Sequence, residues 1–357
     1  MSQLPSSNLN SASLSWIMSV IIYLKPIFKK AIYNALALFK FMVPTVIAIK
    51  IFQELNLVGY LAYPFTPIME VLGLPSIYAL AWIGGILNNN YTTFSILLLL
   101  FPSAPLNYEQ LTVITLISLV FHSIIVESTI AYKLKINPFW SAGIRFISAV
   151  ILGFLVHIIC QYFGLMQDLV KNPLLYKNYV VNPNFMDLIH NATLGSNYSK
   201  WLLRLAIWIK AEVMMLLLIT IIIFLAFLLV QLLKDLRLLN KINLLFSPLC
   251  RILKISKYNS MVTLITYIIG LSYGWGLLKE EATVNKFFKK DQAFKVITFL
   301  SLAHAIIEDS IIFIILGANG WILILGRTLW AFVVVYVVSR ALLPNLTEKF
   351  KNKYLYH

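Results

Sequence analysis

Long apolar stretches alternate with short polar ones along the chain. Several stretches, such as Val213–Leu233 and Ile311–Val338, hold the roughly 20 apolar residues that a helix needs to cross the hydrocarbon core of a bilayer. Hydrophobic residues make up 60% of the 357 positions and charged residues only 12%, whereas a soluble domain typically carries roughly 25% charged residues. So few charges cannot cover a water-facing surface, and we expect an all-α polytopic membrane protein.

The second half of the chain repeats sequence features of the first half. Motifs around a proline, a histidine and an arginine recur in the same order, about 182 residues further along. A single offset that holds over most of two long segments indicates an internal repeat. The matched pairs are Phe65–Ile68 with Phe246–Leu249, His122–Ser128 with His304–Ser310, and Arg145 with Arg327.

Each unit is predicted to contain four apolar elements in the same order. The second element is interrupted by glycines or asparagines, the third carries the histidine and the fourth the arginine. We place the units at 15–163 and 201–344, with a disordered N-terminus (1–14), an extracytoplasmic linker (164–200) and a cytoplasmic tail (345–357). The elements are Ala31–Phe52, Ser76–Phe101, Tyr108–Lys133 and Pro138–Tyr162, then Ala211–Leu233, Ser260–Leu278, Asp291–Leu316 and Trp321–Leu342.

Charge in equivalent loops predicts how the units are inserted. Gln53–Pro75 contains acidic but no basic residues, whereas its counterpart Lys234–Lys257 contains six lysines and arginines. Because Lys and Arg accumulate in cytoplasmic loops, the units should have opposite orientations, which requires an odd number of crossings in each. We predict two inverted-topology repeats in the cytoplasmic (inner) membrane, each with three spanning helices and one re-entrant broken hairpin, and both termini in the cytoplasm. The same bias explains the net charge of +15 without a nucleic-acid partner.

Ionisable residues near the bilayer centre are costly and therefore indicate a site. His122 and His304 fall near the middle of their predicted helices, and acidic residues follow each of them. Helical spacing places His304 and Glu308 on one face. We expect substrate binding or a proton relay here; the alternative is a charge-paired framework of Glu127 with Arg145 and Asp309 with Arg327. The candidate residues are His122, Glu127, Arg145, His304, Glu308, Asp309 and Arg327.

The interrupted segments are the second candidate site. Half-helix ends leave unpaired backbone groups that transporters use to hold substrates and ions. A tight turn between packed helices is the alternative interpretation. The polar residues at these breaks are Asn88, Asn89, Asn90, Thr92 and Thr93 in the first unit, and Ser272 and Tyr273 in the second.

One stretch resembles a known family. Gly270–Glu281 followed by His304–Ser310 is similar to the nucleoside-recognition, or Gate, domain family of membrane proteins, which includes spore maturation proteins and the Gate segments of ferrous-iron permeases. The resemblance covers the second unit best and implies the fold and a transport-like role. The first unit departs from it at two places. Val126 replaces the acidic residue that aligns with Glu308, and Asn88–Asn90 replace the glycine-rich break.

Three functions remain open at this point. The first is a secondary transporter or permease for a small polar solute, nucleoside-like or lipid-headgroup in character, coupled to protons or another ion. The second is an intramembrane hydrolase of lipid phosphates, with His304 as base, Glu308 orienting it and Arg327 holding phosphate. The third is a divalent-metal permease. The expected partners are the lipid bilayer, a small-molecule substrate and, as an option, a second copy in a homodimer; no cofactor is expected.

Other residues carry no predicted role. Cys160 and Cys250 lie far apart without a partner motif, so neither a disulfide nor a metal-thiolate site is expected. His157 has no counterpart in the repeat and is assigned to packing, while His190 and His357 lie in the linker and at the end of the chain.

Overall fold

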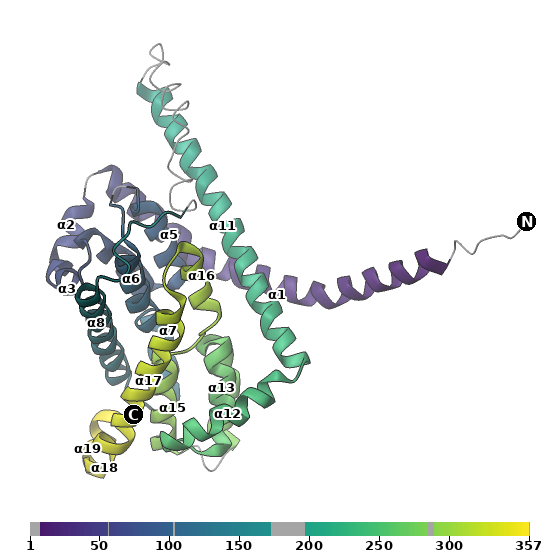
Figure 1. Ribbon diagram of the computed structural model, residues 1–357, viewed down its shortest axis with the longest axis vertical. Coiled ribbons are helices and arrows are strands. Elements are labelled where there is room, and N and C mark those ends of the chain that lie inside the picture. The colour runs from purple at the N-terminus through teal and green to yellow at the C-terminus, as the bar shows by residue number, and fades with distance from the viewer. Residues whose placement is uncertain (1–7, 56, 103, 173–196, 285–288, 357) are drawn as a thin grey trace, which may run out of the picture.

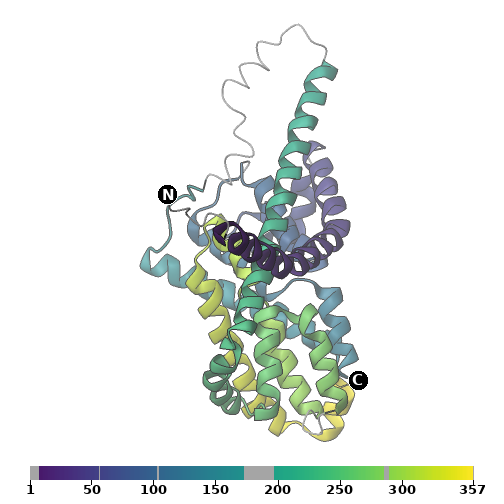
Figure 2. The same ribbon diagram turned by 90° about the vertical axis from the view of Figure 1, so that its right-hand side faces the viewer.

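The computed structural model describes residues 8–55, 57–102, 104–172, 197–284 and 289–356. Within these ranges the protein is all-helical and contains no strand, only two isolated β-bridges. Of the predicted disordered N-terminus, residues 1–7 lie outside the described residues, and 8–14 are helical as the start of α1; of the predicted linker, 173–196 lie outside them. Helix α11 (Asn197–Asp235) runs along the height of the molecule, and α1 (Asn8–Glu54) crosses it and projects from the body with the N-terminus (Figures 1 and 2).

Apolar helices long enough to span a membrane are present in both halves. Four helical runs pass by length and composition among the described residues, and up to six if two bent pairs each count as one span. The predicted span Asp291–Leu316 is not among them. The single runs are Tyr108–Lys133, Pro138–Phe163, Trp208–Leu233 and Ile322–Asn345; the bent pairs are Met18–Ala37 with Met42–Phe52 and Gly59–Val71 with Ser76–Leu87.

The interrupted segments form two helical hairpins. In the first, α4 (Ala79–Leu87) turns into α5 (Asn90–Leu100), and the Thr93 hydroxyl donates to the Ala81 carbonyl across the hairpin at 3.1 Å. The Asn89 side chain caps α5 by accepting from the Thr92 amide. In the second, α13 (Lys257–Ile269) turns into α14 (Leu271–Val284) at Gly270. Every residue of α5 is buried, so the polar groups of this hairpin lie inside the protein.

The two histidine-bearing elements are broken rather than continuous. The first consists of α6 (Tyr108–Val120) and α7 (Ile124–Lys133), and the second of α15 (Lys290–Leu302) and α16 (Glu308–Leu316). The residue after each histidine has a left-handed backbone, with φ 47° at both Ser123 and Ala305. The hairpins accept the amides freed by the breaks: the Ser123 N–H donates to the Gly85 carbonyl and the Ile306 N–H to the Tyr267 carbonyl.

Contacts at the two ends of the molecule show that these elements run in opposite directions. At one end, Ile136 after α7 bridges to Tyr356, whose hydroxyl donates to Asp291 at the start of α15. Burial and the Asp291 carboxylate raise the pKa of Tyr356. At the other end, the Asn319 amide after α16 donates to Thr112 in the first turns of α6. The start of α6 therefore lies with the end of α16.

The two loops that differ in charge also lie at opposite ends. The Gln110 side chain of α6 donates to the Gly73 carbonyl at 3.0 Å, and the Gln292 side chain of α15 donates to the Lys254 carbonyl at 3.0 Å. These contacts are equivalent under the repeat offset, and both carbonyls belong to residues with positive φ. The first loop is therefore attached at the start of α6 and the second at the start of α15.

The remaining elements frame this core. Helix α8 begins after the Asn137 N-cap with a proline in its first turn and ends at Gly164. The predicted polar connection of the second unit contains an amphipathic helix, α12. The predicted tail forms short helical turns that pack on the body. The bounds are α2 Val58–Ala62, η1 Tyr63–Phe65, α3 Thr66–Val71, η2 Ser76–Tyr78, α8 Pro138–Phe163, α12 Leu238–Ile252, η3 Ile322–Gly326, α17 Arg327–Val337, η4 Val338–Leu342, α18 Leu343–Asn345, α19 Glu348–Phe350 and η5 Lys351–Leu355.

Candidate functional site

A cavity of about 640 Å³ lies where the two hairpins meet the two broken elements. Its walls include both hairpin breaks, at Asn88–Asn90 and at Ile269–Leu271, together with residues of α1. The turns after both histidines line it as well, so the predicted hairpin site and the predicted histidine site lie in the same cavity. Among its lining residues are Asn88, Asn90, His122, Glu127, Gly270 and His304.

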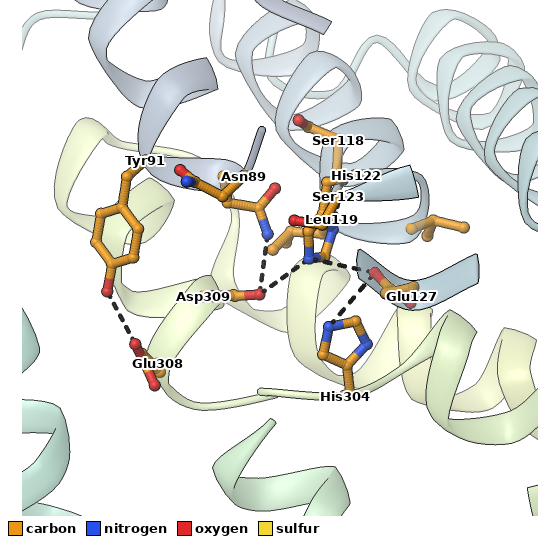
Figure 3. A network of polar contacts seen from close by, with 12 residues as sticks. Asn89, Tyr91, Ser118, Leu119, His122, Ser123, Glu127, His304, Glu308 and Asp309 are labelled. Carbon is orange, nitrogen blue, oxygen red and sulfur yellow. Dashed lines mark hydrogen bonds and ion pairs between the residues drawn. The ribbon is translucent and has the colours of Figure 1, made fainter. Parts of the chain in front are cut away.

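The two histidines face each other across this site. Their ring centroids are 5.1 Å apart, and both side chains are buried (Figure 3). His122 Nδ1 lies 3.1 Å from the Ser118 carbonyl oxygen, and His304 Nδ1 lies 2.8 Å from the Leu300 carbonyl oxygen. Because a carbonyl only accepts, each Nδ1 carries the proton, and in the neutral ring Nε2 presents a lone pair.

Carboxylates surround the two Nε2 atoms. Glu127 Oε1 lies 3.7 Å from His122 Nε2 and 3.8 Å from His304 Nε2. Asp309 Oδ2 lies 3.6 Å from His122 Nε2 and accepts a hydrogen bond from Asn90 Nδ2 at 2.9 Å. Each half of the molecule therefore contributes a histidine and a carboxylate, and each carboxylate lies against the histidine of the other half (Figure 3).

Glu308 is placed differently from the sequence expectation. The break between α15 and α16 removes the helical spacing that would have put Glu308 beside His304. Its carboxylate instead accepts a hydrogen bond from the Tyr91 hydroxyl at 3.0 Å, on the hairpin of the other unit. Tyr91 was not predicted as a site residue; its match to Tyr273 at the repeat offset was the available signal.

The buried arginines hold the carbonyls at the helix breaks. Arg145 donates to Glu127 at 2.7 Å, as expected, and also to the His122 carbonyl at 2.6 Å. Arg327 donates to the His304 carbonyl at 2.9 Å. Asp309 and Arg327 interact electrostatically, as expected, but not as a direct ion pair, because the described hydrogen bond and close contact of Asp309 go to Asn90 and His122.

The arginines also connect the two halves reciprocally. Arg145 donates to the Ser301 carbonyl of α15 at 3.1 Å, and Arg327 donates to the Leu119 carbonyl of α6 at 3.3 Å. The two acceptors are equivalent under the same offset that relates the arginines. One pattern of contacts is thus made twice, once in each direction, around the pair of histidines.

The other predicted polar residues have structural contacts at the hairpins. Asn88 donates to the Thr45 hydroxyl at 2.7 Å, while Asn89 caps α5 and also contacts the Thr92 hydroxyl. The side chains of Ser272 and Tyr273 lie outside the described residues, although both positions belong to α14.

A second polar pair, the buried Glu109 and the partly buried His157, lies away from the cavity. His157 Nδ1 is 2.5 Å from Glu109 Oε1, and Gln161 and Gln167 both donate to Glu109 Oε2. His157 is therefore part of a packed polar cluster, in agreement with its assignment to packing. Glu109, which carries that cluster, was not singled out from the sequence.

Taken together, the apolar helices and the buried polar centre define an integral, multi-pass membrane protein. The chain is similar to the uncharacterized membrane protein YvoD of Bacillus subtilis strain 168, at 24% identity over 300 residues, which cover 84% of this chain and 88% of the relative. No protein-family model and no solved structure matches the chain. The resemblance to Gate domains therefore remains a prediction from the sequence.

Proposed function

We propose that the chain is a secondary transporter that moves a small polar solute through the cavity between its two halves. The observation that supports this proposal most strongly is that both hairpin breaks and both histidines line the same cavity. In transporters with inverted repeats, substrate sites lie near the bilayer midplane where broken helices of the two repeats meet. The two units would be inserted in opposite orientations and would rock against each other around this site.

Two further observations support the inverted arrangement. The first histidine-bearing element starts at the end of the molecule where the second one finishes. The reciprocal contacts of the two arginines relate the halves as a two-fold axis would. Non-helical backbone at membrane depth is tolerated where it lines a cavity or is buried in protein, which is the situation of both hairpin breaks.

The polar wall of the cavity suits a solute with hydrogen-bond donors. Asn90 Oδ1 is buried and has no hydrogen-bond partner in the described structure, although Asn90 Nδ2 is bonded to Asp309. A buried acceptor without a partner is costly, so a donor group of the solute would be stabilised there. A nucleoside-like compound or a lipid headgroup carries such donors, and the histidines supply a group that can couple transport to protons.

The arrangement does not favour a lipid-phosphate hydrolase. That function needs Arg327 to reach phosphate and Glu308 to orient His304. The Arg327 guanidinium is wholly buried and bonds to backbone carbonyls, and Glu308 is bonded to Tyr91.

Uptake into proteoliposomes tests the proposal. Purified protein is reconstituted, and accumulation of nucleosides and other small polar solutes is measured with and without an imposed pH gradient. We expect at least one solute to accumulate, N90A to weaken its uptake, and H304Q to remove the dependence on the pH gradient. The matched control N345A changes an exposed asparagine on α18 and should transport normally. Absence of flux for every solute, or equal uptake by N90A and the native chain, would contradict the proposal.

A further inference from the structure

The centre of the cavity brings three acceptor atoms together, of which Glu127 Oε1 also accepts a hydrogen bond from Arg145 Nη2 at 2.7 Å. The Nε2 atoms of His122 and His304 both face Glu127 Oε1, at 3.7 and 3.8 Å. The Nδ1 protons of both rings are directed at backbone carbonyls, so neither Nε2 carries a proton in the neutral ring. Glu127 Oε2 is buried and has no hydrogen-bond partner in the described structure. A buried acceptor without a partner is costly, and a cation bound beside Glu127 would satisfy it.

One divalent cation satisfies this arrangement better than protons do. A proton on one Nε2 would satisfy one histidine and leave the other Nε2 facing an acceptor. Protons on both would place two imidazolium rings 5.1 Å apart, beside two buried arginines. A metal ion accepts electron pairs from both nitrogens and from the carboxylate at the same time.

The spacing is close to that of a metal centre. One ligand atom from each of His122, Glu127 and His304 lies within 4.8 Å of the others. Tetrahedral zinc with bonds of 2.0–2.1 Å separates its ligand atoms by roughly 3.3 Å. The two histidine–carboxylate separations would need to shorten by about 0.4 to 0.5 Å, and the separation of the two nitrogens by up to about 1.5 Å. Each ring is already oriented by a carbonyl on its other nitrogen, which is the usual outer support of a metal-binding histidine.

We propose that His122, His304 and Glu127 bind one divalent transition-metal ion, of the kind typified by Zn²⁺, at the floor of the cavity. Two imidazoles with one carboxylate select such ions over Mg²⁺ and Ca²⁺, which prefer oxygen ligands. Three protein ligands leave a coordination position open towards the cavity, and the cavity provides the entry path. Movement of this ion across the membrane rests on the proposed transport function, whereas its binding does not.

Metal titration of the purified full-length chain tests the site. The protein is stripped with chelator in detergent, and Zn²⁺ binding is measured by equilibrium dialysis with metal analysis, while Co²⁺ is followed by its visible absorption. We expect one ion per chain. The double variant H122Q/H304Q keeps the side-chain volume but removes both nitrogen ligands, and should bind at least about 100-fold more weakly. The matched control H157Q changes a partly buried histidine that also contacts a glutamate, outside the cavity, and should bind as the native chain does.

Further measurements distinguish loss of metal binding from misfolding of the variants and from loss of transport. Gel filtration and thermal melting of H122Q/H304Q check that it is folded, and E127Q provides a second, single ligand change that should also weaken binding. No metal bound by the native chain, or native affinity in H122Q/H304Q, overturns the site. If chelator-treated vesicles take up solute and the native chain binds no metal, the metal site is contradicted and the transport function is supported. Stoichiometric binding without flux of any ion or solute upholds the site and contradicts the transport function.

Discussion

At the scale of single residues, the two buried arginines explain how broken helices persist at membrane depth. A helix that ends leaves its last carbonyls without intrahelical donors, and lipid offers none. Arg145 supplies donors to Val120 and His122, and Arg327 supplies them to His304. Each guanidinium therefore caps the helix that ends at the histidine, in addition to any role in charge pairing.

Removal of Glu127 should change the stability of the R145M and R327M variants differently. R145M leaves the buried carboxylate of Glu127 without its cationic partner, which should cost about 3–5 kcal/mol of unfolding free energy. Adding E127Q removes that charge and should restore part of the loss. R327M should be destabilising too, because two carbonyls lose their donor. E127Q should restore less of this loss, because Glu127 interacts with Arg327 without a direct hydrogen bond between them. Denaturant unfolding of the four variants in detergent checks this; equal rescue of both arginine variants would show that our assignment of the pairs is incorrect.

Most residues of the candidate site were predictable from the sequence, whereas the contacts between them were not. The repeat and the cost of buried charge singled out both histidines, Glu127 and both arginines. The shared face of His304 and Glu308 was wrong because the spacing argument assumes a continuous helix, and for the same reason Asp309 makes its close contacts with Asn90 and His122. The helix is broken at Ser123 and Ala305, which have left-handed backbones. Serine and alanine do not favour this conformation, so the sequence does not predict the breaks.

At the scale of elements, hairpins and broken helices stabilise each other. The amide freed after each histidine is bonded to a carbonyl of a hairpin in the same unit, while α5 contacts α16 and α14 contacts α7 across the units. Glycine and asparagine clusters predicted the hairpin breaks correctly. The breaks after the histidines carry no such residues and depend on these tertiary contacts, so a local sequence pattern could not show them.

The packing of the turn after α3 against His157 of α8 can be tested with two glycines. Gly73 and Gly164 both have left-handed backbones, with φ +67° and +62°, so alanine at either should cost about 1–2 kcal/mol. A Cβ at Gly73 would also overlap the His157 ring, whereas a Cβ at Gly164 meets nothing within 4 Å. G73A should therefore lower the thermal midpoint clearly more than G164A.

A second substitution shows whether contact with His157 causes the difference between G73A and G164A. G73A must displace His157 from the buried carboxylate of Glu109, and a buried group that loses its partner costs about 1–3 kcal/mol. If H157A is already present, adding G73A should cost no more than G164A does. Equal effects of G73A and G164A in the native background would contradict the packing described here.

At the scale of the whole molecule, the account depends on the opposite orientation of the two units. Charge bias predicts it, and it stays a proposal that is supported by the contacts of Gly73 with α6 and of Lys254 with α15 at opposite ends of the molecule. Span number was harder to predict, because α1 is one long bent helix and the last histidine-bearing element is two short helices. Composition alone does not distinguish such elements from simple spans.

Cysteine labelling tests this orientation most directly. In a chain with Cys160 and Cys250 replaced by alanine, single cysteines are placed at the exposed positions Glu70 and Lys241, one in each loop, and at Lys135 as a second cytoplasmic reference. Intact cells are treated with a membrane-impermeant maleimide before and after permeabilisation. E70C should be labelled in intact cells, and K241C and K135C only after permeabilisation. Labelling of E70C and K241C from the same side would contradict the inverted arrangement and, with it, a cavity shared by two oppositely inserted hairpins.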